Sequence, residues 1–452
     1  MFPTLEDLTG SALALSRLQD TYHLDVTILA NGRLTGVTQS TMTINDCFIL
    51  GRVLFEEKYY EHALHWLIEA LRKYKIHNES YNYSEKENRK YIIQALYSLG
   101  DVKTILEITK KIVALDADYL EPIDEIISFQ KNVDVHNHIF NKNENREKTE
   151  YKEIFANYLK KEKIVYEALC RGDIKRSDQI SKRLKCSYLS DNHPFLKLGP
   201  IKMEQVYIAP DVIMFHQVIS DDEIEHIKEL AKTEFERSVI VTEPKNHTGM
   251  PANDRISKTS WIYDHQSPVV KRITQRVADF TGLNIISAEP LQVANYGIGG
   301  HFTPHFDFFV KSQRPSKESK MRKLGNRIAT VLFYMSEVAQ GGATVFTELG
   351  LSVFPVKNAA VFWMNLHPSG EGDIATRHAA CPVLRGSKWV SNKWIHQVGQ
   401  EYIRPCTTEY QKEEVKRKFP KPQFKTSNKK LEQLLHDWFS NGGIQNLFNN
   451  NI

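Results

Sequence analysis

The chain has 452 residues, more than one ordinary hydrophobic core accommodates, so we expect several domains. Hydrophobic residues make up 41% and charged residues 25%, which excludes a chain that is disordered throughout. Lysine and arginine outnumber aspartate and glutamate only by 59 to 55, too small an excess to indicate a nucleic-acid or membrane-surface partner. No apolar run reaches the roughly 18 residues that a membrane span needs.

The first 43 residues contain one predicted helix. Apolar residues repeat at helical spacing over residues 5–18, whereas residues 20–43 show little periodicity. A His-x-Asp triplet lies there, from His23 to Asp25, and we discount it because the region reads as helix or loop. The N-terminus lacks the basic and apolar segments of a signal peptide, so we expect no export signal in the chain as given.

Residues 44–130 are predicted to form an all-helical domain. Helical periodicity covers residues 44–76, 91–99 and 102–115. The placement of Gly51 and Ala63 among larger apolar residues is typical of tetratricopeptide helix pairs. Any antiparallel helix pair gives similar spacing, and this remains the alternative.

The remaining chain divides into a connection, a β-rich domain and a tail. Residues 131–193 are mostly polar and charged, which indicates a charged linker and helical connection. Over residues 194–406 the period falls to about two, and glycines separate short strands, a pattern that favours a sandwich, barrel or jelly roll. Residues 407–452 are predicted to be a basic C-terminal extension, in which residues 411–430 are expected to be flexible because they carry most of the positive charge. The clearest strand candidates are residues 291–296, 328–335, 359–365 and 387–398.

Three residues of the β-rich domain could hold a metal ion. His305 and Asp307 are two positions apart, so they face the same side if this segment is a strand. His378 would complete two histidines and one carboxylate, the set that binds Fe(II) and leaves coordination positions open. The alternative for His378 is a polar loop residue.

Lys388 is a candidate for binding an anion. It opens a strand-like run in which it shares a face with Trp394, so it is interior if Trp394 is interior. A buried lysine requires an anion, and the far carboxylate of 2-oxoglutarate would serve. A solvated lysine at a sheet edge is the alternative.

From about Leu8 to Cys406 the chain resembles the alpha subunits of collagen prolyl 4-hydroxylase, which are iron and 2-oxoglutarate dioxygenases. The resemblance implies a tetratricopeptide-like peptide-substrate-binding domain followed by a double-stranded β-helix (jelly-roll) catalytic domain. It also implies hydroxylation of peptidyl proline in collagen-like X-Pro-Gly sequences with Fe(II), 2-oxoglutarate, O2 and ascorbate. The matching blocks are residues 291–297, 304–308, 325–330, 332–336, 341–346, 369–373, 376–384 and 388–394.

The resemblance assigns roles to the candidate residues. It implies that His305, Asp307 and His378 are the iron ligands. Lys388 would bind the 2-oxoglutarate carboxylate. Three further positions correspond to the lining of the co-substrate pocket, with ordinary barrel packing as the alternative: Tyr296, Thr330 and Trp394.

Five scattered cysteines alone leave the cellular compartment open. The resemblance implies that Cys170 pairs with Cys186 and Cys381 with Cys406, while Cys47 is unpaired. It therefore implies the endoplasmic reticulum lumen and assembly of two alpha subunits with two protein disulfide isomerase (beta) subunits. Residues 1–43 would be the end of the family's longer N-terminal dimerisation region, which follows a signal peptide.

The resemblance also places a groove for a proline-rich peptide on the helical domain, with Tyr91 and Tyr97 in it. These tyrosines could instead only pack between helices. Four residues replace the expected tyrosines, arginine and asparagine of that groove: Gln94, Glu121, Glu125 and Ser128. We therefore expect weaker peptide binding or a different sequence preference.

Two other functions compete with collagen hydroxylation. The same chemistry could act on a non-collagen prolyl protein, which the altered groove favours. Alternatively, the chain could be a catalytically silent peptide-binding subunit. The presence of His305, Asp307, His378 and Lys388 argues against the silent subunit.

Overall fold

The computed structural model divides the chain into two compact units, residues 1–153 and 154–452, which are treated separately here. Among the described residues, no helix is long and apolar enough to cross a bilayer. The structure describes residues 4–34, 40–77, 83–99, 102–115, 146–238, 254–310, 323–407, 421–440 and 443.

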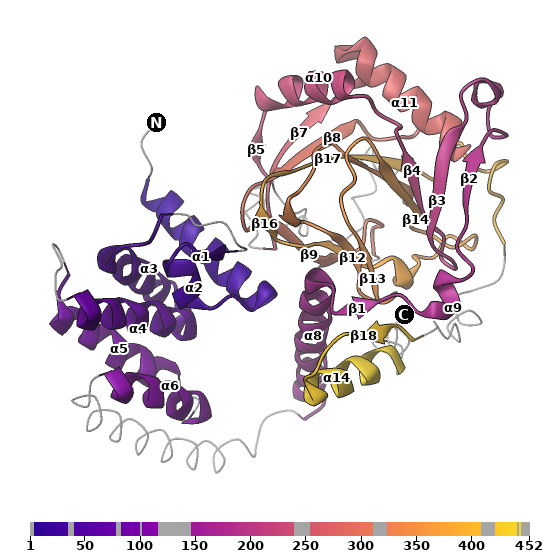
Figure 1. Ribbon diagram of the computed structural model, residues 1–452. Helices are drawn as coiled ribbons and strands as arrows, with labels where there is room; N and C mark the ends of the chain where they lie inside the picture. Colours follow the sequence, from indigo (N-terminus) through magenta and orange to yellow (C-terminus); the bar gives the residue numbers. More distant parts are fainter. Residues whose placement is uncertain are drawn as a thin grey trace. The chain divides into compact units, whose positions relative to one another are not determined.

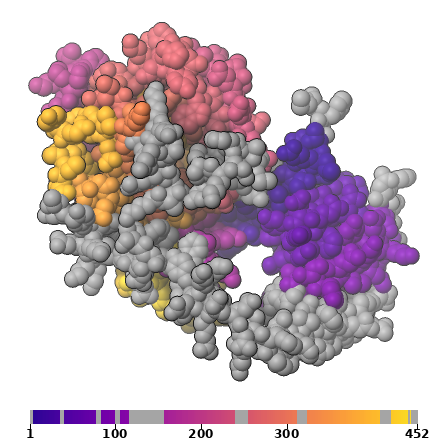
Figure 2. All heavy atoms as spheres, turned by 180° about the vertical axis from the view of Figure 1, so that it is seen from behind, coloured from indigo at the N-terminus to yellow at the C-terminus, as the bar shows by residue number. Residues whose placement is uncertain are grey.

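The first unit is helical, and its indigo-to-purple atoms form one closely packed body (Figure 2). Thr4 and Thr43 are the N-cap residues of two helices. In each, the threonine hydroxyl accepts from the backbone N–H of the aspartate three residues later, and that aspartate accepts from the threonine N–H. A Cβ atom on Gly51 would lie 2.6 Å from Cγ of Leu67, so the close contact of the third and fourth helices requires glycine there. The helices are α1 (Leu5–Tyr22), α2 (Val26–Ala30), α3 (Ile44–Glu56), α4 (Tyr60–His77), α5 (Glu85–Leu99) and α6 (Val102–Leu115).

The second unit is a jelly roll built from a large and a small antiparallel sheet (Figure 1). In spatial order, the large sheet contains β2 (Cys186–Leu189), β3 (Ile201–Tyr207), β4 (Val212–His216), β14 (Ala360–Met364), β10 (Arg327–Tyr334), β17 (Lys388–His396), β8 (Leu291–Tyr296), β7 (Lys258–Ile262) and β5 (Glu236–Arg237). The small sheet contains β13 (Leu351–Val353), β12 (Thr344–Phe346), β15 (His378–Ala380), β9 (His301–His305) and β6 (Arg255–Ile256). A separate pair is formed by β11 (Gln340–Gly341) and β16 (Val383–Arg385).

The two faces of the large sheet bury different partners. Helices α10 (Asp221–Lys232) and α11 (Pro268–Thr281) cover its outer face (Figure 1). Along β10, Val331 and Phe333 belong to the core beneath these helices, whereas Leu332 and Tyr334 belong to the core between the sheets. This alternation explains why most residues of β10 are apolar, because a strand buried on both faces has few positions at which a polar side chain is satisfied.

The segment after the helical unit is more ordered than a linker. Its main element is α8 (Arg146–Arg171), and it continues through β1 (Ile174–Lys175), α9 (Asp178–Ser181) and the exposed strand β2. The residues at the C-terminal end of α8 are buried in the second unit. The predicted boundary near residue 130 lies outside the described residues.

The expected flexible tail, residues 411–430, contains regular structure over residues 423–430, where β18 (Gln423–Phe424) lies and α14 (Lys429–Ser440) begins. β18 pairs with β1, and α14 lies beside α8 (Figure 1). Trp438 is buried, and its ring lies 5.1 Å from that of Tyr158 on α8. The positive charge of the segment hid these apolar anchors, which recur at helical spacing.

The predicted disulfide pairing is also wrong. Cys170, at the end of α8, is bonded to Cys381, just after β15, with Cα atoms 5.5 Å apart. Cys186 and Cys406 are exposed free thiols, so neither the Cys170–Cys186 nor the Cys381–Cys406 bond is present. The packing of α8 on the small sheet brings the two buried cysteines together across 211 residues, which spacing along the chain does not reveal. Cys47 is free and buried, as expected.

This pairing predicts the outcome of disulfide mapping. Digestion of the native protein after alkylation of free thiols should yield one cross-linked peptide pair containing Cys170 and Cys381. Cys186 and Cys406 should carry the alkyl label because both thiols are accessible. Mass spectrometry of the non-reduced digest makes the measurement, and recovery of a Cys170–Cys186 peptide would contradict the structure.

Candidate metal centre

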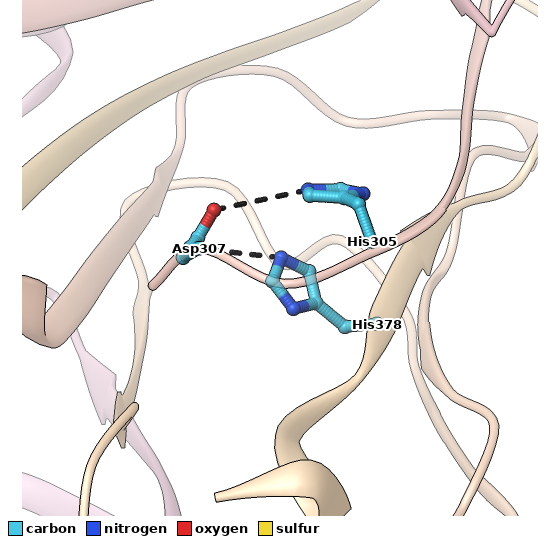
Figure 3. Close-up of side chains that lie close together, drawn as sticks. All are labelled: His305, Asp307 and His378. Carbon is cyan, nitrogen blue, oxygen red and sulfur yellow. Dashed lines mark ion pairs between the residues drawn. The ribbon is translucent and has the colours of Figure 1, made fainter. Parts of the chain in front are cut away.

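The three candidate metal-binding residues come together on the small sheet. His305 ends β9 and His378 begins β15, and the two are direct partners in the antiparallel ladder. Nε2 of His305 lies 3.8 Å from one carboxylate oxygen of Asp307, and Nε2 of His378 lies 3.6 Å from the other. Figure 3 shows the three side chains converging, with their potential ligand atoms all within 4.8 Å of one another.

Backbone hydrogen bonds orient both imidazoles. Nδ1 of His305 donates to the carbonyl of Thr303 at 2.8 Å, and Nδ1 of His378 donates to that of Thr376 at 2.9 Å. Because Nδ1 carries the proton in each ring, the lone pair is on Nε2, the atom that faces Asp307. Burial, followed by the neighbouring His378, lowers the pKa of His305 well below its usual value and so keeps this ring neutral.

Asp307 is held ionised by its surroundings. Thr330 donates to its Oδ2 at 2.7 Å, and Asn365 in turn donates to the Thr330 hydroxyl at 2.8 Å. Burial opposes ionisation, but nearby positive charge, which includes the Arg327 guanidinium, outweighs it and lowers the pKa of Asp307 below its usual value. Two imidazoles and one carboxylate, all oriented towards one point, fit the donor set that Fe(II) accepts in oxygenases.

A buried ion-pair network lies behind Asp307. Arg327 donates to the backbone carbonyl of Asp307 at 3.4 Å and forms a two-pronged pair with Glu289 at 2.5 and 2.9 Å. Nε2 of His396 also contacts Glu289, at 2.8 Å. Trp394 lies against the Arg327 guanidinium, 3.9 Å from ring centre to Cζ. The network therefore holds the backbone of Asp307 in place.

Lys388 is buried on the inner face of the large sheet, only 2% exposed. Its Nζ donates to the Thr344 hydroxyl at 3.4 Å and lies 5.8 Å from the ring centres of Tyr296 and Tyr334. Burial lowers the pKa of Lys388 to about 7. No carboxylate contacts it among the described residues, so this position suits an anion from outside the chain.

The predicted pocket residues all lie on the face that the sheets enclose, but with different neighbours. Tyr296 is opposite Lys388 in the ladder between β8 and β17. Thr330 contacts Asp307, and Trp394 is the ladder partner of Thr330.

Several polar neighbours of the site were not predicted from the sequence: Glu289, Arg327, Tyr334, Thr344 and Asn365. The alternation along β10 could have revealed Tyr334, because it shares a face with Thr330.

The predicted groove tyrosines differ in their surroundings. Tyr91 is partly buried and lies edge-on to Phe48 and Phe55, with ring centres 6.0 and 5.3 Å away. Tyr97 and Gln94 are exposed on α5. Packing between helices thus accounts for much of the burial of the Tyr91 ring, whereas the Tyr97 side chain is accessible to solvent. Glu121, Glu125 and Ser128 lie outside the described residues.

Gly372 is predicted to be essential to the position of Asp307. An added Cβ atom at Gly372 would overlap the ring of Phe308, the residue after Asp307. Gly372→Ala should therefore displace Phe308 and weaken Mn(II) binding, used as a redox-stable probe, by about tenfold, a loss typical of disturbed outer-sphere residues. Isothermal titration calorimetry measures the affinity.

Gly297→Ala is the matched control for this substitution, because its new methyl group would meet nothing within 4 Å. It should bind Mn(II) as the unmodified chain does. Equal affinity in Gly372→Ala, with the fold intact by circular dichroism, would show that Phe308 does not transmit the displacement to Asp307.

The family models match most of the chain. Residues 291–396 match the 2OG-Fe(II) oxygenase superfamily. Residues 44–133 match the prolyl 4-hydroxylase peptide-substrate-binding domain, and residues 1–36 match the N-terminal region of the prolyl 4-hydroxylase alpha subunit. A solved structure of a viral collagen prolyl hydroxylase from Paramecium Bursaria Chlorella virus-1, in complex with 2OG, is 22% identical, with a TM-score of 0.34, and covers 41% of this chain and 96% of that chain.

Curated relatives extend over nearly the whole chain. The human prolyl 4-hydroxylase subunit alpha-1 is 45% identical over 417 residues, covering 90% of this chain and 77% of that protein. The alpha-2 subunit of Caenorhabditis elegans is 44% identical over 427 residues, covering 92% of this chain and 76% of that protein. The chain therefore belongs to the prolyl 4-hydroxylase alpha subunits, enzymes of the Fe(II)- and 2-oxoglutarate-dependent oxygenase superfamily.

Proposed function

We propose that His305, Asp307 and His378 bind the iron of this prolyl 4-hydroxylase. The convergence of two Nε2 lone pairs and an ionised carboxylate within 4.8 Å carries the proposal. When bound, Fe(II) supplies O2 activation coupled to decarboxylation of 2-oxoglutarate to succinate. The chain's own part is to hold the three ligand atoms in place before the metal arrives, which reduces the free-energy cost of organising the site.

Lys388 is the proposed partner of the far carboxylate of 2-oxoglutarate. Its support is a buried ammonium group with a hydroxyl neighbour and no carboxylate among the described residues. The Tyr334 hydroxyl donates to Thr344 at 2.9 Å, which leaves the Thr344 proton free to reach the same anion. Tyr296 and Tyr334 flank the ammonium group and keep water from it, so an ion pair formed there is strong.

Thr330 and Trp394 have proposed positioning roles nearer the iron. The Thr330 hydroxyl fixes one oxygen of Asp307 and leaves the other for the metal. Trp394 covers Arg327, the cation that contacts the Asp307 backbone. Both residues share the inner face of the large sheet with Lys388, which supports their assignment to the lining of the co-substrate site.

The proposed substrate is peptidyl proline in collagen-like X-Pro-Gly sequences, presented by the helical unit. Its support is the match to the peptide-substrate-binding domain and the accessible Tyr97. Gln94 is exposed on the same helix at the place of an expected tyrosine, which supports weaker binding of proline-rich peptides. Hydroxylation of a different prolyl protein is the second candidate, because that same replacement alters the groove.

The finer setting is proposed from the family. The chain would act in the endoplasmic reticulum lumen, in a tetramer of two alpha and two protein disulfide isomerase subunits, with ascorbate restoring Fe(II). The Cys170–Cys381 bond supports an oxidising compartment, because such bonds are rare in the cytosol.

A decarboxylation assay tests the proposed function. Protein co-expressed with protein disulfide isomerase and loaded with Fe(II) should convert 2-oxoglutarate to succinate faster when a (Pro-Pro-Gly)-repeat peptide is added. Mass spectrometry should locate 4-hydroxyproline in that peptide. Peptide-independent turnover alone would preserve the iron site and favour the second substrate class.

Replacement of His378 distinguishes the proposed ligand set from any other. His378→Ala should abolish succinate formation because it removes one of the three ligand atoms. His216→Ala, on β4 and paired with Glu204, is the matched control and should retain turnover. Full activity of His378→Ala would exclude His378 from the iron site.

Affinity for 2-oxoglutarate should fall as pH rises. With its pKa lowered to about 7, Lys388 is charged below that pH and mostly neutral above it, in the absence of the anion. Above pH ~7, binding must first protonate Lys388, so the Kd should rise by up to about tenfold for each pH unit. Anaerobic titration of the Mn(II)-loaded protein with 2-oxoglutarate, at pH values from about 6 to about 9 on either side of this pKa, measures the slope.

Lys388→Gln provides the control, because an amide does not titrate over this range. It should bind 2-oxoglutarate weakly at every pH and show no slope of this origin. A Kd independent of pH in the unmodified chain would contradict the assignment of Lys388.

A further inference from the structure

Arg377 lies next to His378 and is almost enclosed, with 12% of its side chain exposed. Its guanidinium forms a two-pronged pair with Glu162 of α8, at 2.5 and 2.9 Å. Glu162 is buried and also accepts a hydrogen bond from the Thr347 hydroxyl at 3.3 Å. Two-pronged pairing fixes the plane of the guanidinium as well as its position, which a single hydrogen bond does not.

The same guanidinium contacts the other metal-binding segment. Its Cζ atom lies 5.0 Å from the centre of the Phe306 ring. Phe306 stands between His305 and Asp307 in the chain, so a displacement of its ring that carries the backbone with it also moves both neighbours. Arg377 thus joins the segment carrying His378 to the segment carrying the other two metal-binding residues, in addition to the pairing of β9 with β15.

One face of α8 packs against the segment around His378. Besides the Glu162–Arg377 pair, the Tyr166 hydroxyl donates to the carbonyl of Ala380 at 3.2 Å, and Cys170 is bonded to Cys381. These three α8 residues are spaced by four, so they lie along one face of the helix. α8 therefore contacts the strand of His378 at three successive turns.

We propose that Arg377, held by Glu162, is a positioning residue for the iron centre. It orients His378 through the backbone and the segment of His305 and Asp307 through Phe306. The inference rests on the proposed assignment of those three residues as iron ligands. Glu162 has a second effect: it neutralises a guanidinium that would otherwise repel a divalent cation nearby.

Metal affinity tests the proposal without relying on turnover. Mn(II) binding by calorimetry should be about tenfold weaker in Arg377→Lys, which keeps the charge but loses the planar fork. Glu162→Gln should also weaken binding. In the double variant Glu162→Gln/Arg377→Lys, the loss of Mn(II) binding free energy should be smaller than the sum of the losses in the two single variants, because Glu162 acts through Arg377. The Co(II) absorption spectrum should change in each variant, because it reports the geometry of the ligands.

Arg276→Lys and Glu223→Gln are the matched controls. These residues form an equivalent two-pronged pair, at 2.8 and 2.9 Å, between α10 and α11 on the outer side of the large sheet. They should lower the melting temperature without changing Mn(II) affinity or the Co(II) spectrum. If the Arg377 variant does not fold, the milder Glu162→Gln, which keeps the side-chain volume, decides the test.

The outcomes separate the two levels of the argument. Failure of the unmodified chain to bind Mn(II) would overturn the proposed iron ligands themselves. Normal binding by the unmodified chain, with affinity and Co(II) spectrum unchanged in folded Arg377→Lys and Glu162→Gln, would overturn only the positioning role. In that case, a loss of stability equal to that of the control pair would show that Arg377 and Glu162 form an ordinary structural ion pair.

Discussion

The antiparallel pairing of β9 with β15 is the constraint on which the rest of the catalytic unit depends. It sets His305 opposite His378, so that two imidazoles from segments more than seventy residues apart are neighbours in one ladder. A register shift by a single residue would turn one of them to the opposite face of the sheet. Both histidines also contact backbone carbonyls and aromatic rings, and these contacts form only in this register.

Burial then gives the site its electrostatic character. The interior of the jelly roll holds charges of both signs, and each is compensated differently. Arg327 has Glu289, while Asp307 has nearby cationic and hydrogen-bonding groups. Of the two cations, Lys388 has no acidic partner in the described part of the chain. A buried ammonium group without a carboxylate inside the jelly roll is consistent with the proposed site for an acidic small molecule.

The sequence predicted the structure best where the spacing of residues along a helix or strand determines which side chains are buried. Alternation along residues 388–396 placed Lys388 and Trp394 on one face, and both are indeed buried. His305 and Asp307 also converge as expected, although β9 ends at His305 and Asp307 follows it, so strand alternation alone does not place the carboxylate. Gly51 could be recognised because tight helix packing selects for a missing side chain.

Long-range packing accounts for what the sequence did not reveal. The partner of Cys170 depends on where α8 meets the small sheet, and no pattern near either cysteine records that contact. Arg377 and Glu162 are ordinary charged residues in a charged chain, and only their enclosure distinguishes them. The C-terminal segment looked solvated because of the lysines and arginine that precede α14, whereas Leu435 and Trp438, which anchor it, lie within the helix.

The pairing of β1 with β18 has a consequence for biosynthesis. The second unit begins with α8 and β1 and is closed by β18 and α14, which almost end the chain. Every contact between these two ends must wait until the ribosome has made all the intervening strands, so the unit has a high contact order. The helical unit, built from neighbouring helices, can form while synthesis continues.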